Sequence, residues 1–216
     1  MSWCILPNGT YFLTGGIHED FGEHSDQAWD ITPELDATIL LSMNNSRSKH
    51  ASIYFNDYIY VFGGETNNQK CIKKAERYTG VWEDLPDLHR SRVNVSCSSW
   101  GDEYIYIASS NERLLERYHY DSNKFEILNY SLGSGLMKVL IPDADDDIYL
   151  IEESNLSRLI KGGVDLDTWP LLQWVNCIPM IKGSRAYFVN QSGIMHIRGL
   201  TENCINEDVD LNKINT

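Results

Sequence analysis

The sequence predicts an all-β fold built from repeated four-stranded sheets. Three observations support this prediction. An aromatic-rich strand pattern recurs along the 216-residue chain, turn-forming residues separate neighbouring strands, and no segment shows convincing helical periodicity. Self-similarity at a regular interval is the signature of repeat architectures, so the repeat dominates the expected fold.

The recurring strand alternates aromatic and aliphatic residues. Its clearest copy is Tyr58–Gly64, in which Tyr-Ile-Tyr-Val-Phe is followed by two glycines. Strict alternation of this kind is typical of a β-strand. The interval between successive copies shortens slowly along the chain. The five copies lie at 10–16, 58–64, 104–108, 148–151 and 186–189.

Each copy is the second member of a predicted hairpin. A short apolar run precedes it, and turn residues such as Asn56 and Asp57 separate the two. Asn, Asp and Gly tolerate the positive φ that tight hairpin turns require. A polar loop and two further short runs follow, as at Ala75–Tyr78 and Val81–Leu85. Four short strands per repeat indicate the blade of a β-propeller.

The hairpin spacing predicts about five blades in one domain, 1–216. The last repeat is the shortest, and its final strand is weak. We therefore expect either a small closed ring or an incomplete ring, and the short last repeat favours the incomplete one. The expected blades cover 2–48, 49–92, 93–135, 136–173 and 174–216.

The second repeat resembles the kelch motif. Val61-Phe62-Gly63-Gly64 is followed by Tyr78 and Trp82, and Arg47 and His50 resemble the residues that open a kelch unit. The resemblance implies a kelch-type β-propeller. Glycines would allow sharp turns and close approach, and the aromatic residues would pack between blades. The residues expected to be architectural are Gly15, Gly16, Gly63, Gly64, Tyr78 and Trp82.

The later repeats depart from the motif. Ser109-Ser110, Glu152-Glu153 and Asn190-Gln191 occupy the places of the two glycines in the third, fourth and fifth repeats. These three blades are therefore predicted from their spacing and hairpin chemistry, and not from the motif. A different propeller with short strands remains the alternative.

The charge balance excludes several classes of partner. Acidic residues number 31 and basic residues 18, which gives a formal charge of −13. Phosphate-rich surfaces require a basic face, so we expect neither nucleic acid nor an anionic membrane as a partner. The five cysteines form no CxxC pair, and no signal-peptide pattern is present. Both observations favour a cytoplasmic protein with reduced thiols.

Six basic side chains gather in two predicted inter-blade loops of this acidic chain. If the loops share a rim, they form a basic patch suited to an acidic peptide, because arginine pairs well with carboxylates. The alternative is solvated loop charge together with one structural arginine per blade. The candidate partner-binding residues are Arg47, Lys49, His50, His89, Arg90 and Arg92.

No metal, cofactor or catalytic site is expected. The loop His18–His24 holds two histidines and three acids, but it lacks the HExxH spacing and a helix. Asp143–Asp147 imitates a calcium loop without its glycine and its final glutamate, so it is expected to be a hairpin turn. Nucleophile-elbow, P-loop and dinucleotide-binding motifs are absent from the sequence.

These observations favour a non-catalytic module that binds another protein through loops on one face. The kelch resemblance implies a substrate adaptor of a ubiquitin ligase or a cytoskeletal scaffold. Two alternatives remain. One is a propeller enzyme acting on a small molecule, as galactose-oxidase-like or sugar-directed propellers do. The other is a degenerate propeller fragment without an autonomous function.

Overall fold

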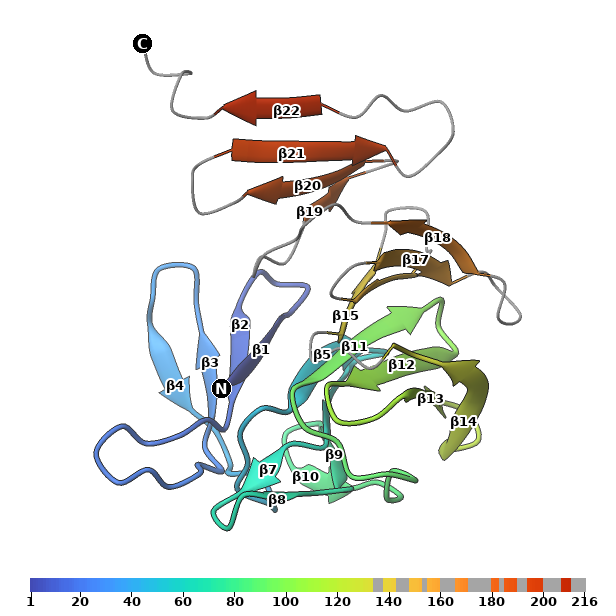
Figure 1. Ribbon diagram of the computed structural model, residues 1–216. Coiled ribbons are helices and arrows are strands. Elements are labelled where there is room, and N and C mark those ends of the chain that lie inside the picture. The colour runs from blue at the N-terminus through green and yellow to red at the C-terminus, as the bar shows by residue number, and fades with distance from the viewer. Residues whose placement is uncertain are drawn as a thin grey trace. The chain divides into compact units, whose positions relative to one another are not determined.

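A computed structural model describes the chain as strands joined by turns and loops (Figure 1). Where its residues are described, it contains no helix, which confirms the all-β prediction. The chain divides into two compact units, Met1–Leu140 and Ile141–Thr216, which we treat separately. The described residues are 1–133, 138–142, 148–152, 155–159, 166–170, 180–182, 185–189, 194–199 and 207–210.

The first unit holds three antiparallel four-stranded sheets. Their strand orders are β1-β2-β3-β4, β10-β9-β6-β5 and β11-β12-β13-β14. The first comprises β1 (Ser2–Ile5), β2 (Tyr11–Thr14), β3 (Ala28–Ile31) and β4 (Ala37–Ile39). The second comprises β5 (Ala51–Phe55), β6 (Tyr58–Phe62), β9 (Ala75–Tyr78) and β10 (Trp82–Asp84). The third comprises β11 (Val95–Trp100), β12 (Tyr104–Ser109), β13 (Leu114–His119) and β14 (Lys124–Ser131).

The other two four-stranded sheets found among the described residues repeat this pattern. Their orders are β15-β16-β17-β18 and β19-β20-β21-β22. The fourth sheet comprises β15 (Lys138–Pro142), β16 (Ile148–Glu152), β17 (Asn155–Leu159) and β18 (Leu166–Pro170). The fifth comprises β19 (Met180–Lys182), β20 (Arg185–Val189), β21 (Ile194–Gly199) and β22 (Glu207–Asp210).

One small element was not expected from the sequence. The loop after β6 contains a two-stranded hairpin, β7 (Glu65–Thr66) and β8 (Lys70–Cys71). The turn between β5 and β6 was predicted correctly, since Asn56 and Asp57 have φ values of 46° and 64°. Two successive positive φ values match the twist of a two-residue hairpin.

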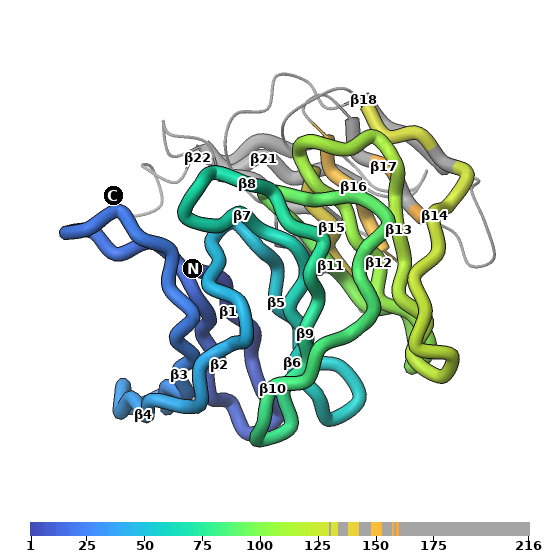
Figure 2. The backbone as a smooth tube through the Cα atoms, turned by 90° about the horizontal axis from the view of Figure 1, so that it is seen from below, coloured from blue at the N-terminus to red at the C-terminus, as the bar shows by residue number. Residues whose placement is uncertain are grey.

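The sheets of the first unit lie side by side in chain order (Figure 2). Their first strands are neighbours, with β1 and β11 on either side of β5. Aromatic side chains fill the space between consecutive sheets. Phe12 packs against Tyr78 and Trp82, with ring centroids 5.3 and 6.3 Å away. Between the second and third sheets, the largest fully buried apolar side chains are Tyr60, Phe62, Leu88, Ile105, Ile107 and Tyr118.

Candidate functional site

Four loops meet at one end of the second and third sheets. The backbones of Ser48 and Glu65 exchange two hydrogen bonds of 3.0 and 2.9 Å. The amide of Arg92 donates to the carbonyl of Ile72, and the amide of Ser110 donates to the carbonyl of Val93. These bonds join two sets of loops, namely those that connect one blade to the next and those that connect the second and third strands within a blade.

Seven basic side chains are exposed on these joined loops, which we call the basic rim. Three come from the loops between blades and four from the loops within blades. Three of the seven have an acidic partner: Lys49 pairs with Glu65 at 2.6 Å, Lys74 with Asp87 at 2.8 Å, and His89 with buried Glu116 at 2.8 Å. The members of the basic rim are Lys49, Lys70, Lys73, Lys74, His89, Arg90 and Arg113.

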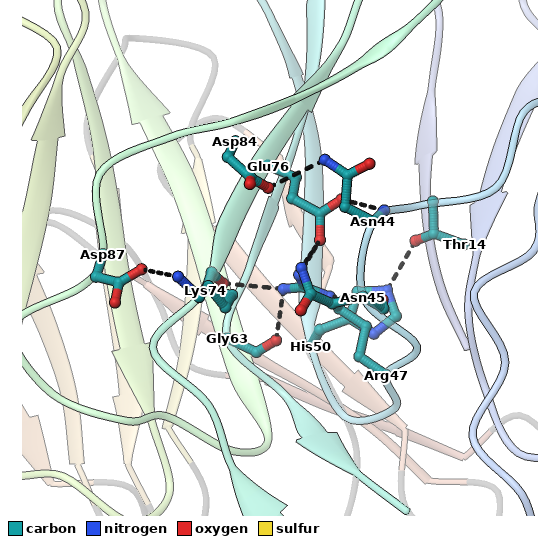
Figure 3. A network of polar contacts seen from close by, with 10 residues as sticks. All are labelled: Thr14, Asn44, Asn45, Arg47, His50, Gly63, Lys74, Glu76, Asp84 and Asp87. Atoms are coloured by element: carbon teal, nitrogen blue, oxygen red, sulfur yellow. Dashed lines mark hydrogen bonds and ion pairs between the residues drawn. The ribbon is translucent and has the colours of Figure 1, made fainter.

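The guanidinium of Arg47 is fully buried, and Figure 3 shows the polar contacts that surround it. Its Nη1 donates to the carbonyls of Gly63 and Lys74, each at 2.9 Å, and its Nη2 pairs with Glu76. Burial lowers the pKa of Arg47, and the Glu76 carboxylate opposes that shift. Glu76 also accepts a 2.7 Å hydrogen bond from the amide of Asn44. The buried pair therefore ties the loop before β5 to the second sheet.

Arg92 repeats this arrangement in the third sheet. Its Nε donates to Glu116 at 2.9 Å, and its Nη2 donates to the carbonyl of Leu114 at 2.8 Å. Its Nη1 donates to the hydroxyl of Ser109 at 3.2 Å. Ser109 stands where the second repeat has Gly63, so a hydroxyl accepts where a glycine carbonyl accepted before. The third repeat thus departs from the glycine motif but keeps the same buried arginine–glutamate pair, which we call the arginine bracket in both sheets.

Burial separates the six candidate partner-binding residues into two groups. Arg47, His50 and Arg92 are 0%, 5% and 0% exposed, so their side chains do not reach a partner. The alternative of one structural arginine per blade describes Arg47 and Arg92, since each guanidinium donates to buried carboxylate, carbonyl or hydroxyl acceptors of its own sheet. Lys49, His89 and Arg90 are exposed, and partner binding stays a prediction for them.

Sequence reasoning missed four members of the basic rim. Lys70, Lys73, Lys74 and Arg113 belong to loops within blades, whereas the candidate residues predicted from the sequence come from the loops between blades. Both sets of loops lie at the same end of an antiparallel four-stranded sheet, and hydrogen bonds between the loops then bring their side chains onto one surface. The clustering of three lysines at 70–74 is the signal that could have found most of them.

His50 lies between the first two sheets. Its Nε2 is 2.7 Å from the hydroxyl of Thr14, and its Nδ1 has no hydrogen-bond partner among the described residues. Burial, and then the charges of Arg47 and the N-terminus, hold the pKa of His50 well below its usual value. The imidazole is therefore neutral in the folded protein at neutral pH.

We expect His50 to contribute to acid sensitivity. Because the unfolded chain binds a proton near pH 6.5 and the folded chain does not, stability falls as pH drops below that value. One such proton gives a slope of up to about 1.4 kcal/mol per pH unit. Urea unfolding from pH 7 to 5 should show a shallower slope for His50→Gln than for wild type. An unchanged slope in His50→Gln, or an equal change in the exposed His18→Gln control, would contradict this role.

The remaining candidate sites do not assemble a metal centre in the described residues. His24 of the His18–His24 loop places its Nδ1 2.6 Å from the carbonyl of Glu65, which anchors the loop to the β7–β8 hairpin. No group of three or more His, Cys, Asp or Glu side chains within the described part of the chain could hold a metal ion. Asp143–Asp147 lies outside the described residues. The described residues include no helix of the length and apolarity that a bilayer span needs.

Comparison with known proteins identifies the motif in the second sheet. Residues 46–89 match the model of the kelch motif. The chain contains a kelch repeat. The match begins at the loop that carries Arg47 and ends beyond β10, so it spans the whole second sheet. The resemblance predicted from Val61–Gly64, Tyr78 and Trp82 is thereby confirmed.

Solved structures show the same fold. The selenomethionine-substituted virginiamycin B lyase from Staphylococcus aureus aligns with a TM-score of 0.65 at 12% identity. A catalytically inactive variant of that lyase with quinupristin aligns at 0.67 and 13%. Each match covers 99% of this chain and 70% of that chain. These propeller-like neighbours, together with the four-stranded sheets, confirm the predicted β-propeller fold. No curated protein sequence matches the chain.

The glycines of the kelch repeat meet a neighbouring backbone. Gly63 and Gly64 have φ values of 63° and 101°, which residues with a Cβ rarely adopt. A Cβ on Gly63 would lie 2.8 Å from the carbonyl oxygen of Arg92, and one on Gly64 would lie 2.6 Å from that of Ser48. Gly15 and Gly16 of the first sheet have φ values of 55° and 116°. The glycine pairs therefore let the loops between blades approach the end of the second strand.

Proposed function

We propose that this kelch propeller is a protein-binding module whose basic rim binds an acidic segment of a partner protein. The observation that carries the proposal is the gathering of exposed cations on joined loops of a chain with a net charge of −13. Carboxylates form strong charge-assisted hydrogen bonds with lysine and arginine. Loops on a rigid scaffold are also the usual position of binding residues.

The free cations of the rim support an acidic partner. Lys70, Lys73, Arg90 and Arg113 form no ion pair with any residue that the structure describes. By contrast, the carboxylates of Glu76 and Glu116 beneath them are fully buried and neutralised by Arg47 and Arg92. The buried acids therefore do not compete for the surface cations. Binding at such a rim should weaken with salt, because exposed charges are screened.

Charge reversal at the rim tests this proposal. Arg90→Glu should weaken binding of a fluorescent hexaglutamate peptide by up to about tenfold, which corresponds to about 1.4 kcal/mol. Fluorescence anisotropy at low and physiological salt measures the affinity. Lys124→Glu is the matched control, because Lys124 is exposed at the turn at the opposite end of the third sheet.

Binding that is equal in the two variants would contradict a basic rim. Affinity capture from native lysate with Arg90→Glu and Lys124→Glu then distinguishes partners that bind the basic rim from partners that bind elsewhere. A partner retained by Arg90→Glu and lost with Lys124→Glu would move the site to the other end of the blades.

The kelch repeat also supports a more specific proposal about the kind of binding module. We propose a substrate adaptor of a ubiquitin ligase or a cytoskeletal scaffold, acting in the cytoplasm and without a cofactor. Both roles need only a protein-binding surface on a rigid support. The likeness to the lyase concerns the fold, at 12 to 13% identity, so no lyase activity is proposed.

A further inference from the structure

The loop between β2 and β3, residues 15–27, carries the most exposed Phe, Tyr or Trp side chain in the part of the chain that the structure describes. Phe21 is 74% exposed, and its ring contacts that of His18 at a centroid distance of 6.4 Å. Large rigid side chains such as aromatic rings contribute much of the binding energy at protein interfaces. Phe21 is therefore a candidate anchor at the end of the sheets where the loops meet.

Backbone hydrogen bonds hold this loop closed. The amide of His18 donates to the carbonyl of Glu23 at 2.9 Å, and the amide of Gly22 donates to the carbonyl of His18 at 2.8 Å. Gly22 has a φ of 65°, which lets the chain turn back directly after Phe21. Because this backbone is ordered before a partner arrives, binding at Phe21 costs little conformational entropy.

The exposure of Phe21 follows from its place at the tip of the loop. The corresponding loop of the second sheet, 63–74, belongs to a sheet with a neighbouring sheet on each side (Figure 2). Its tip, residues 67–70, is exposed in spite of both neighbours. The tip of this loop is therefore a surface position even in a blade that is flanked on both sides, and Phe21 occupies that position in the first sheet.

The loop lies directly beside the basic rim. The Nδ1 of His24 donates to the carbonyl of Glu65 at 2.6 Å, and the amide of His24 donates to the side chain of Asn67 in the turn of the β7–β8 hairpin. The side chain of Glu65 pairs with Lys49 of the basic rim, and Lys70 of the basic rim belongs to the same hairpin. A partner segment that lies on the basic rim can therefore continue over this loop.

The charges of the loop limit which part of a partner can reach Phe21. Glu19, Asp20 and Glu23 are exposed beside it, whereas the basic rim is cationic. Like charges that are brought together across an interface oppose binding. The acidic stretch of a partner must therefore end where the loop begins, and an uncharged apolar side chain is the group that Phe21 can bury.

We propose that the partner segment of the basic rim joins its acidic stretch to an apolar side chain that packs on Phe21. This inference rests on the proposed function, because the acidic stretch on the basic rim positions the apolar side chain. It adds a second contact of different chemistry. The acids provide charge-assisted hydrogen bonds that salt weakens, whereas the apolar contact removes surface from water and does not depend on screening.

Matched peptides test the apolar contact. Hexaglutamate is extended through one glycine by two leucines, at its C-terminal end in one peptide and at its N-terminal end in another, and serines replace the leucines in two control peptides. Each peptide carries its fluorophore at the acidic end, and fluorescence anisotropy with the full chain measures affinity. At least one leucine peptide should bind about fivefold more tightly than its serine control, as burial of roughly 40 Å² of apolar surface predicts.

Variants at Phe21 assign this gain to the loop. Phe21→Ser should remove it, and Phe21→Trp should keep it. Val81→Ser is the control, because Val81 is an exposed apolar residue in the turn at the other end of the second sheet, and it should keep the gain. The gain should also persist at high salt, where the serine controls bind more weakly. Near-ultraviolet circular dichroism checks that each variant is folded.

The outcomes separate this inference from the proposed function. If Arg90→Glu weakens binding of the serine controls but neither leucine peptide gains affinity, the basic rim stands and the apolar contact is rejected. A gain that survives Phe21→Ser rejects the contact as well. If the serine controls do not bind, or bind wild type and Arg90→Glu equally, the proposed function fails and this inference fails with it.

Discussion

Arg47→Ala should lower the free energy of unfolding by about 3–5 kcal/mol, because it leaves the buried Glu76 carboxylate without its cation. Both side chains of this pair are 0% exposed. The change also removes the donors to the Gly63 and Lys74 carbonyls. An unpaired buried charge is among the few defects that cost this much in a single substitution. Urea unfolding followed by tryptophan fluorescence measures the loss.

Two comparisons separate the buried charge from simple loss of a side chain. Lys74→Ala removes the exposed pair with Asp87 and should cost less than about 1 kcal/mol. The double variant Arg47→Met/Glu76→Leu removes both charges and should recover most of the loss, because no uncompensated carboxylate remains. A loss of under 1 kcal/mol in Arg47→Ala, or a double variant as unstable as the single one, would contradict a stabilising role of the buried Arg47–Glu76 pair.

The second large effect is expected for Gly15→Ala. Gly15 has a φ of 55°, and a Cβ there would overlap the carbonyl oxygen of Arg47 and lie 2.8 Å from Cε1 of His50. The left-handed conformation costs an alanine about 1–2 kcal/mol, and the overlap adds about 1–3 kcal/mol. We therefore expect a total loss of about 2–5 kcal/mol in urea unfolding.

Gly101 provides a matched control for this substitution. Its φ of 52° is close to that of Gly15, but a Cβ there would meet no atom within 4 Å. Gly101→Ala should therefore cost only the conformational part, about 1–2 kcal/mol. The difference between the two variants measures the close approach between the glycine and the loop that follows. Equal losses in both would mean that the approach contributes nothing.

The strands could be predicted from the sequence because their signals are local. Alternation over four to six residues and turn residues such as Asn56-Asp57 act within one hairpin. The β7–β8 hairpin escaped prediction, since strands of two residues are too short to show a period. The role of Ser109 also escaped prediction. Its side-chain hydroxyl accepts a hydrogen bond from Arg92, whereas the residue at the same position in the second repeat, Gly63, accepts one from Arg47 with its backbone carbonyl.

The burial of the arginines could not be predicted by the same means. Arg47 meets Glu76, and Arg92 meets Glu116, only after the loop before each sheet has folded back over its third strand. Charged residues are seldom buried unless paired, so the sequence left open whether each arginine is a surface cation or the one structural arginine of its blade. The recurrence of an arginine before the first strand and a glutamate in the third strand, in two consecutive repeats, is the signal that would have revealed the pairs.

The buried pair of Arg47 and Glu76 also determines which stretch of the chain could be duplicated or transferred as a complete blade. Asn44 and Arg47 precede β5, yet they saturate the Glu76 carboxylate of the sheet that β5 begins. A gene segment that starts at residue 49 would encode all four strands of the second blade and an orphaned buried acid. One that starts at residue 44 would carry its own counter-ion. Duplication, grafting or recombination of this blade should therefore respect a boundary inside the preceding loop, several residues ahead of the first strand.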